Sequence, residues 1–499
     1  MENSSRTFRS FGIAWLVLSL LAALWAIATP IGAAPDEPAH LIKAASVVRG
    51  QLVGEHGANG QVVQVPKYIA FTPAQTCYAF DGNITADCVP GVTGDPTEIV
   101  DSSTTAGLYN PLYYAIVGWP SLIAADSSGI YAMRLVSGVV TSAFLAAGFW
   151  LIAGWRRRVI PILGYLTAVT PMVLFLNGTV NPNALEIGAT LAAFVGVLTV
   201  VREPDDTRRV VPIIVLVSAA IAANMRGLSL LWLAIALLSP FLLVGLDRIR
   251  DLLRVRWVLI ALIGTAAAAI AALIWVLGSN SLGSAISDPE PVTNAPGVGT
   301  SPILGFAWTI SSTFLYGQEL VGLFGWLDTP APAYVYFTWS ALVGGLLLGA
   351  FVLLRGRVLA LVLGLTALVI VLPAVVQGIY IEDGGVVWQG RYILPLFVCL
   401  VIAAAAALGD VIELPGSSAT RLLWIVLGAW VLAQWLAFTW ALKRYSAGLD
   451  SGWLEILSPR WQPPGTTVGL TLGFALLLGA GGAALILALR EPRTLARDR

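Results

Sequence analysis

The sequence has 499 residues, of which 57% are hydrophobic and only 11% are charged, and its mean hydropathy is +0.82. Soluble proteins carry about 25% charged residues, so this composition excludes an ordinary soluble protein and indicates a membrane protein. The 28 Lys and Arg balance the 28 Asp and Glu, which leaves no net basic charge to attract nucleic acid. With two His and three Cys in the chain, a Cys/His zinc site or an iron–sulfur cluster is also excluded.

Apolar stretches of transmembrane length recur along the whole chain. A hydrocarbon core of about 30 Å needs roughly 20 apolar residues in a helix, and about twelve stretches meet that requirement. The predicted spans are residues 11–31, 130–154, 159–180, 183–201, 210–223, 227–246, 257–278, 334–354, 358–377, 393–409, 422–442 and 467–489. The sequence therefore predicts an all-α polytopic membrane protein.

The distribution of basic residues predicts the orientation. If the N-terminus is cytoplasmic, about two thirds of the 28 Lys and Arg fall on the cytoplasmic side, as the positive-inside rule requires. Residues 107–125 are apolar too, but they contain Pro111 and Pro120, and a span there would move Arg156, Arg157 and Arg158 to the outer side. We therefore predict that both termini are cytoplasmic. Residues 107–125 and 303–327 are interpreted as interfacial helices of the outer leaflet.

The first extracytoplasmic loop, residues 32–129, is long and polar, which predicts that the working surface lies outside. Cys77 and Cys88 fall in this loop, where the compartment is oxidising and a disulfide between them is a candidate. Two free thiols are the alternative. Cys399 stands alone in a predicted span.

The segment that follows the first predicted span combines acidic and basic side chains. It reads Pro-Asp-Glu-Pro-Ala-His-Leu-Ile-Lys and opens a helix that continues to about residue 50. Asp36 or Glu37 suits the N-cap of that helix. A spacing of four places His40 on the same face as Asp36, and Lys43 follows on the next turn. Asp36 is thus either a structural cap or a general base, and the sequence leaves both interpretations open.

Other polar residues stand where apolar ones are expected. Asn181 and Asn183 lie in a turn between the third and fourth spans, and turn chemistry does not explain Glu186, which follows them. Arg226 is the sole cation between two short spans, where it either snorkels to head groups or binds a ligand.

A further cluster, Gln389, Arg391 and Tyr392, precedes the tenth span. Arg391 either pairs with Glu382 or Asp383 or binds phosphate through its planar fork. A carboxylate beside cations is what sugar transfer from a polyprenyl-phosphate donor requires, because the acid accepts the hydroxyl proton and the cations stabilise the leaving phosphate. We find no P-loop or dinucleotide-binding glycine motif.

The motifs PDEPAH, NPLYY, AMRL, NGTVNPNA, GLFGWLD and WQGRYILP occur in this order. Over residues 11–409 the chain resembles the bacterial membrane family called domain of unknown function 2142. That family is itself similar to the GT-C superfamily of polytopic glycosyltransferases, which includes arabinosyltransferases of mycobacteria.

The resemblance implies a GT-C-like bundle of about twelve transmembrane helices with a long first extracytoplasmic loop and interfacial helices. It implies Asp36 as the catalytic base, with Glu37 as its catalytic neighbour or substitute. Arg226, Arg391, Tyr392, His40 and Lys43 are then candidates for binding the donor phosphate, and Asn181, Asn183 and Gln389 for binding substrate. Asparagines occupy the place of a second acid in many GT-C enzymes, so we assign no metal ligand. Mg²⁺, Mn²⁺ or Ca²⁺ is retained only as a possible cofactor.

These expectations define a working hypothesis. Residues 1–409 form the GT-C-like module, and residues 410–499 add C-terminal helices and an outer loop. The donor is a polyprenyl-phosphate sugar, and the acceptor is an envelope glycan or glycolipid. The protein is expected in the bacterial plasma membrane, with its active site on the extracytoplasmic side. Whether transfer inverts or retains the anomeric configuration is left open. The alternatives are a transporter or flippase of lipid-linked saccharides, and a non-catalytic envelope scaffold.

Overall fold

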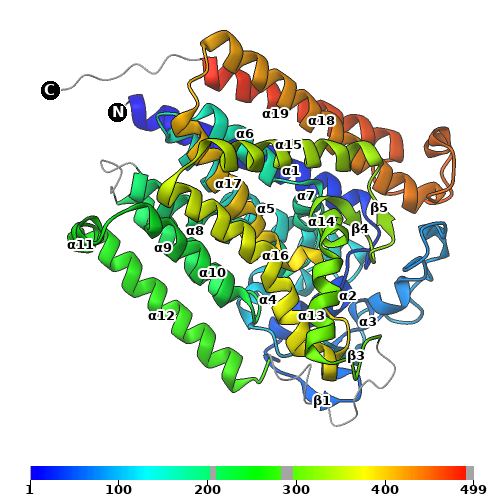
Figure 1. Cartoon of the computed structure of the whole chain (residues 1–499). Helices are drawn as coiled ribbons and strands as arrows, with labels where there is room; N and C mark the ends of the chain where they lie inside the picture. Colours follow the sequence, from blue (N-terminus) through cyan, green and yellow to red (C-terminus); the bar gives the residue numbers. More distant parts are fainter. Residues whose placement is uncertain (1, 203–208, 282–295, 491–499) are drawn as a thin grey trace.

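The computed structural model describes residues 2–202, 209–281 and 296–490 and is a bundle of long helices (Figure 1). Within these ranges nine helices are long and apolar enough to cross a membrane. They are α1 (Glu2–Ala28), α5 (Ser127–Gly154), α8 (Pro182–Arg202), α12 (Arg256–Gly278), α15 (Ala333–Leu353), α16 (Gly356–Gly384), α17 (Leu394–Val411), α18 (Gly416–Ala447) and α19 (Thr467–Arg490). The prediction of an all-α polytopic membrane protein is confirmed. The predicted cytoplasmic C-terminal residues 491–499 lie outside the described residues.

Three predicted spans differ from straight helices. The third is broken into α6 (Val159–Ala168) and α7 (Pro171–Asn177), which meet at 62° because Thr170 precedes a proline and is extended. The sixth consists of α10 (Ser229–Leu238) and η5 (Ser239–Leu243), after which the chain bends by 116° into α11 (Leu246–Arg254). The fifth is α9 (Val210–Ala223), only 14 residues long.

Two central helices form the core. Helices α8 and α17 are buried almost throughout, and α8 packs against α5, α9 and α17. Both are apolar on every side, as a helix surrounded by others requires. Small residues allow close approach: a Cβ atom added at Gly164 would lie 2.2 Å from the Cβ atom of Ala405. Helix α12, by contrast, lies at the periphery and leaves most of its apolar surface exposed.

The predicted outer loop, residues 32–129, folds into short helices and a small sheet. Its elements are α2 (Glu37–Val47), β1 (Glu55–Gly57), β2 (Gly60–Pro66), α3 (Lys67–Ala70), η1 (Thr72–Gln75), η2 (Ala86–Cys88), β3 (Ile99–Thr104), α4 (Pro111–Gly118) and η3 (Trp119–Leu122). The strands form an antiparallel sheet in the order β1-β2-β3, with Val63 opposite Ser102. Val63 and Val65 bury their side chains in a cluster with Leu41 of α2. This sheet therefore holds α2 in place.

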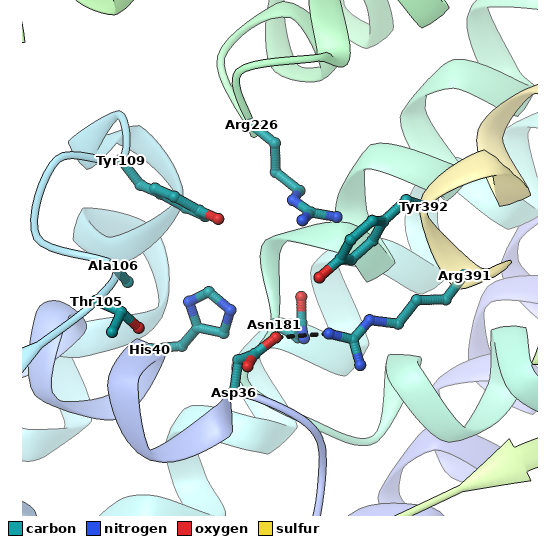
Figure 2. Close-up of a pocket in the computed structure, with 9 residues that line it drawn as sticks. All are labelled: Asp36, His40, Thr105, Ala106, Tyr109, Asn181, Arg226, Arg391 and Tyr392. Atoms are coloured by element: carbon teal, nitrogen blue, oxygen red, sulfur yellow. Dashed lines mark hydrogen bonds and ion pairs between the residues drawn. The ribbon is translucent and has the colours of Figure 1, made fainter. Parts of the chain in front are cut away.

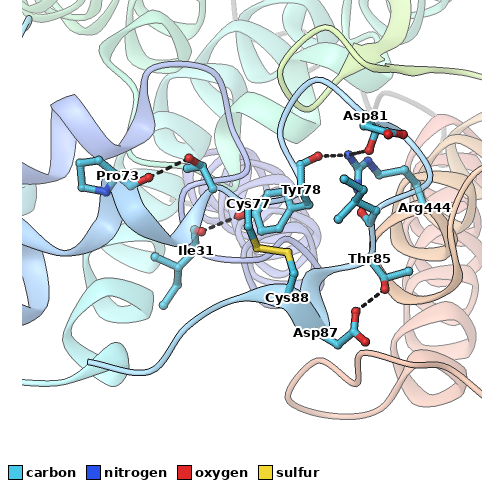
Figure 3. Close-up of a disulfide and its surroundings, with 11 residues drawn as sticks. Ile31, Pro73, Cys77, Tyr78, Asp81, Thr85, Asp87, Cys88 and Arg444 are labelled. Carbon is cyan, nitrogen blue, oxygen red and sulfur yellow. Dashed lines mark hydrogen bonds between the residues drawn. A yellow bond between two sulfur atoms is a disulfide. The ribbon is translucent and has the colours of Figure 1, made fainter. Parts of the chain in front are cut away.

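A disulfide loop links the segment of residues 32–129 to the C-terminal helices. Cys77 and Cys88 are bonded to each other (Figure 3). Arg444 of α18 is fully buried and pairs with Asp328 at 2.9 Å. It also donates hydrogen bonds to the carbonyl groups of Tyr78, Asp81 and Ile84. Residues beyond 409 also belong to the main hydrophobic core. A short helix, η7 (Trp453–Leu457), follows α18.

The residues of 303–327 form two short helices, α13 (Pro302–Ser311) and α14 (Thr313–Gly322), and β4 (Leu323–Phe324), which pairs with β5 (Thr329–Pro330). Helix α13 packs along α16, and α14 contacts η6 (Gly390–Ile393). Neither helix has the length of a span. Their interfacial position in a membrane stays a prediction, as does that of α4.

Candidate functional site

One cavity of about 170 Å³ opens where five parts of the chain meet: α2, the segment before α4, the turn before α8, the loop between α9 and α10, and η6 (Figure 2). Its lining residues are Asp36, His40, Thr105, Ala106, Tyr109, Asn181, Arg226, Arg391 and Tyr392. Six of the residues predicted from sequence therefore lie together. This volume accommodates several water molecules or a small anionic group.

Asp36 stands at the N-cap position of α2, but its side chain makes no capping hydrogen bond. Its backbone is left-handed, with φ 62° and ψ 2°, a conformation that Asp tolerates better than most residues. One carboxylate oxygen accepts a hydrogen bond from Nη2 of Arg391 at 2.5 Å, and 42% of the Asp36 side chain is exposed. Burial alone would raise the pKa of Asp36, but the charges of Arg391, His40 and Arg226 outweigh it and lower that pKa. The carboxylate is therefore ionised in the cavity.

Arg391 retains unused hydrogen-bonding capacity. Only 2% of the residue is exposed, yet its Nε and Nη1 atoms have no hydrogen-bond partner among the described residues. The salt bridge that the sequence suggested with Glu382 or Asp383 is replaced by the one with Asp36. Buried donors without an acceptor cost free energy, so this guanidinium group is poised for an anionic ligand.

A second guanidinium group, that of Arg226, approaches the same cavity. Its Cζ atom lies 4.2 Å from the centre of the Tyr392 ring, and that of Arg391 lies 5.2 Å from the same ring. Figure 2 shows the guanidinium group of Arg226 beside the Tyr392 ring and that of Arg391 directed toward Asp36. Cation–π contacts of this kind orient both charges.

The buried Glu186 accounts for the position of Arg226. It accepts a hydrogen bond from Oγ of Ser229 at 2.5 Å and another from the side chain of Asn183 at 3.0 Å. Ser229 Oγ in turn accepts a hydrogen bond from the backbone N–H of Arg226. Asn183 and Glu186 thus anchor the loop that carries Arg226, and the binding of substrate by Asn183 stays a prediction.

His40 faces the cavity as a neutral ring. Its Nδ1 atom lies 2.9 Å from the hydroxyl oxygen of Tyr114, and its ring packs near that of Tyr109 (Figure 2). Burial lowers the pKa of His40 to about 3, an effect that the charge of Asp36 opposes. At neutral pH His40 therefore offers a hydrogen bond and not the positive charge expected of a phosphate-binding cation.

Two predicted site residues point away from the cavity. Glu37 is fully buried in an ion pair with Arg134 at 2.5 Å. Lys43 is buried, and its ammonium group donates to the carbonyl groups of Leu52 and Gly107. Burial lowers the pKa of Lys43 to about 8. These contacts favour structural roles for Glu37 and Lys43, and the roles in catalysis and phosphate binding expected from the sequence stay predictions.

Asn181 lines the cavity, and its side chain donates to the carbonyl group of Pro35, next to Asp36. Gln389 does not line the cavity, so the structure shows no route for its predicted contact with substrate.

Tyr109 lines the cavity but was not predicted as a site residue. Its neighbours in sequence are apolar and turn residues, and only the fold brings it opposite Arg226.

Two buried side chains that the sequence did not indicate hold η6 in place. Gln377 of α16 accepts hydrogen bonds from the backbone N–H groups of Val387 and Trp388 and donates to the carbonyl group of Gly385. Glu319 of α14 accepts a hydrogen bond from the N–H of Gly390. Burial raises the pKa of Glu319 to about 7, which the bond from Gly390 partly offsets.

The donor set does not fit a divalent cation. Nowhere in the described part of the chain do three or more His, Cys, Asp or Glu side chains gather as metal ligands do. The cavity offers one carboxylate, already paired with a guanidinium group, and a second guanidinium group lies nearby. Hard cations prefer several oxygen ligands with net negative charge. The site suits an anion instead.

The family model described as Predicted membrane protein (DUF2142) matches residues 18–400. Among solved structures, the chain is similar to ArnT from Cupriavidus metallidurans, whose crystal structure contains undecaprenyl phosphate. The identity is 13%, the match covers 94% of this chain and 77% of that chain, and the TM-score is 0.46. No curated protein matches the chain.

Proposed function

The chain belongs to the DUF2142 family of membrane proteins, and we propose that it is a glycosyltransferase that uses a polyprenyl-phosphate-linked sugar at the extracytoplasmic face. The observation that carries this proposal is the joint position of one ionised carboxylate and two arginines, of which Arg391 has unused donors, in a single cavity. Sugar transfer needs a proton acceptor for the incoming hydroxyl and positive charge for the departing phosphate.

Each group takes one role in the proposed reaction. Asp36 accepts the proton of the acceptor hydroxyl while the new bond forms between that oxygen and the anomeric carbon. The bond from the anomeric carbon to the phosphate oxygen breaks, and its electron pair leaves with the polyprenyl phosphate. Arg391 binds that phosphate through Nε and Nη1, and Arg226 adds a second positive charge. Neutral His40 and Asn181 donate hydrogen bonds that orient the sugar or the acceptor.

The surroundings of Arg226 support a lipid-linked donor. This residue lies in the loop between two apolar helices, α9 and α10, and α9 packs against the peripheral helix α12. A phosphate at Arg226 is therefore close to the hydrocarbon region, where a polyprenyl chain is soluble. An envelope glycan or glycolipid hydroxyl is the acceptor that such an extracytoplasmic cavity meets.

Membranes that contain the protein and a panel of radiolabelled polyprenyl-phosphate monosaccharides test this proposal. We expect label to move into a polymer or glycolipid fraction, and Asp36→Asn to slow this transfer by about 10²- to 10⁴-fold, the contribution of a general base. Asp101→Asn is the matched control, because Asp101 is an exposed carboxylate of β3 in the same segment. Its transfer rate should equal that of the wild type.

Two results contradict the proposal. If Asp36→Asn retains full transfer activity, Asp36 is not the base. If the wild type transfers no sugar from any donor but carries labelled lipid-linked sugar across proteoliposome membranes, the protein is a transporter. Abundance and elution profile of each variant on size exclusion separate loss of chemistry from loss of fold.

A further inference from the structure

A second cavity, of about 370 Å³, lies where η5 turns into α11 and meets the first turn of α16. Arg357, which lines it, is the second residue of α16, whereas η6 with Arg391 follows the end of that helix. Helix α16 has 29 residues and is about 43 Å long at 1.5 Å per residue. This α11 cleft and the Asp36 cavity are therefore at opposite ends of the bundle.

The walls of the α11 cleft are mostly apolar. They are formed by Phe241, Leu242, Val244, Leu246 and Ile249, with Arg357 as the charged lining residue. Leu242 and Leu246 are 54% and 72% exposed. Exposed leucines beside an apolar hollow indicate contact with hydrocarbon rather than with water.

The direction of α11 and its alternation of apolar and charged residues indicate that the α11 cleft lies at a membrane surface. The 116° bend turns α11 away from the direction of α10. Figure 1 shows α11 as a short helix at the edge of the bundle, beside the start of α12. Its sequence, LDRIRDLLR, alternates leucine and isoleucine with charged residues at helical spacing. A short amphipathic helix rich in arginine is typical of the boundary between head groups and acyl chains.

The positive charges of α11 and of Arg357 exceed the negative charges around the cleft. Arg250 pairs with Asp247 and Arg254 with Asp251, each within the helix. Arg248 and Arg357, in contrast, have no acidic partner in the described ranges. The Nη2 atom of Arg248 is buried without a hydrogen-bond acceptor there. Two uncompensated guanidinium groups thus accompany the apolar cleft.

We propose that the α11 cleft binds an acidic membrane phospholipid. The fork of Arg357 holds the phosphate, Arg248 adds positive potential, and the upper part of an acyl chain fills the hollow between Leu242 and Ile249. Basic pockets between helices on the positively charged side of membrane proteins recognise lipid head groups in this manner. The inference does not depend on the proposed sugar transfer, because the two cavities are at opposite ends of α16.

Retention of defined lipids by the purified, delipidated full-length protein tests this inference, with native mass spectrometry as the readout. We expect phosphatidylglycerol to be retained roughly tenfold more strongly than phosphatidylcholine with the same chains. Arg357→Glu and the double variant Arg248→Gln/Arg357→Gln should lose this preference. Arg421→Gln, which removes an exposed charge near the start of α18 at the same end of the bundle, should keep it.

Three outcomes overturn the proposal. The first is equal retention of the two phospholipids by the wild type. The second is an unchanged preference in both Arg357 variants. The third is full competition by soluble glycerol phosphate, which would identify a site for free phosphate. Because Arg357 is exposed, its replacement leaves the fold intact, and sugar transfer is measured in parallel as an independent check.

Discussion

Neutralising Glu37 should destabilise the fold much more than neutralising its neighbour Asp36 at the start of α2. Glu37 and Arg134 are both fully buried, and Arg134 donates to both carboxylate oxygens at 2.7 and 2.5 Å. Arg134 also donates to the carbonyl groups of Ala26, Thr29 and Pro30. Glu37→Gln preserves the shape but leaves a buried guanidinium charge uncompensated. Removing one partner of a buried pair costs about 3 to 5 kcal/mol.

Asp36→Asn, in contrast, changes a side chain that is 42% exposed to the cavity, and its amide oxygen still accepts from Arg391. We expect less than about 1 kcal/mol of destabilisation from this change. Thermal unfolding in detergent, followed by tryptophan fluorescence, compares the two variants with the wild type. Glu37→Gln should melt well below the wild type and Asp36→Asn close to it. Equal melting temperatures, or the reverse order, would refute the assignment of Glu37 to structure and Asp36 to the cavity.

Further expectations concern the cavity and the disulfide loop. Arg391→Gln should raise the KM for the donor by roughly 10- to 100-fold, because a hydrogen bond to a charged group contributes about 1.5 to 3 kcal/mol; an unchanged donor KM would remove Arg391 from the phosphate site. Although burial opposes it, nearby positive charge holds the pKa of Asp36 below 3.8, so kcat/KM should be lost only as the pH falls through that range. A limb of the pH profile near 6.5, the ordinary pKa of histidine, would instead indicate that His40 titrates as an unperturbed ring, and it would contradict the lowering of its pKa to about 3 by burial. Replacing Cys77 and Cys88 with serine should destabilise the protein by about 3 kcal/mol, the entropy of closing an 11-residue separation, and an unchanged melting temperature would contradict this.

Hydropathy was sufficient to predict the helical bundle, because a bilayer imposes a minimum apolar length on every span. The bends at Thr170 and after Leu243 were not predictable in the same way, since a window average does not register where the backbone changes direction. The three-stranded sheet was also missed. Its strands are short, and β2 alternates imperfectly, so that only pairing with β3 reveals which side is buried.

The candidate site was predicted in part. Asp36 and His40 stood out as an acid and an imidazole on one face at a helix start. Asn181 and Arg226 stood out as polar residues near apolar spans, and Arg391 as a cation in a short loop. Their contacts depend on residues far apart in sequence, such as the pair of Asp36 with Arg391. No sequence pattern distinguishes Asp36 from Glu37, since the left-handed backbone at Asp36 turns one carboxylate to the cavity and the other to Arg134.

The most direct test of the central claim is a structure of the wild-type protein in nanodiscs with a non-hydrolysable polyprenyl-phosphate sugar analogue. The account predicts phosphate oxygens about 3 Å from Nε and Nη1 of Arg391, with Arg226 on the same group and the anomeric carbon facing Asp36. A phosphate bound elsewhere, with the Asp36 cavity left to solvent, would contradict it.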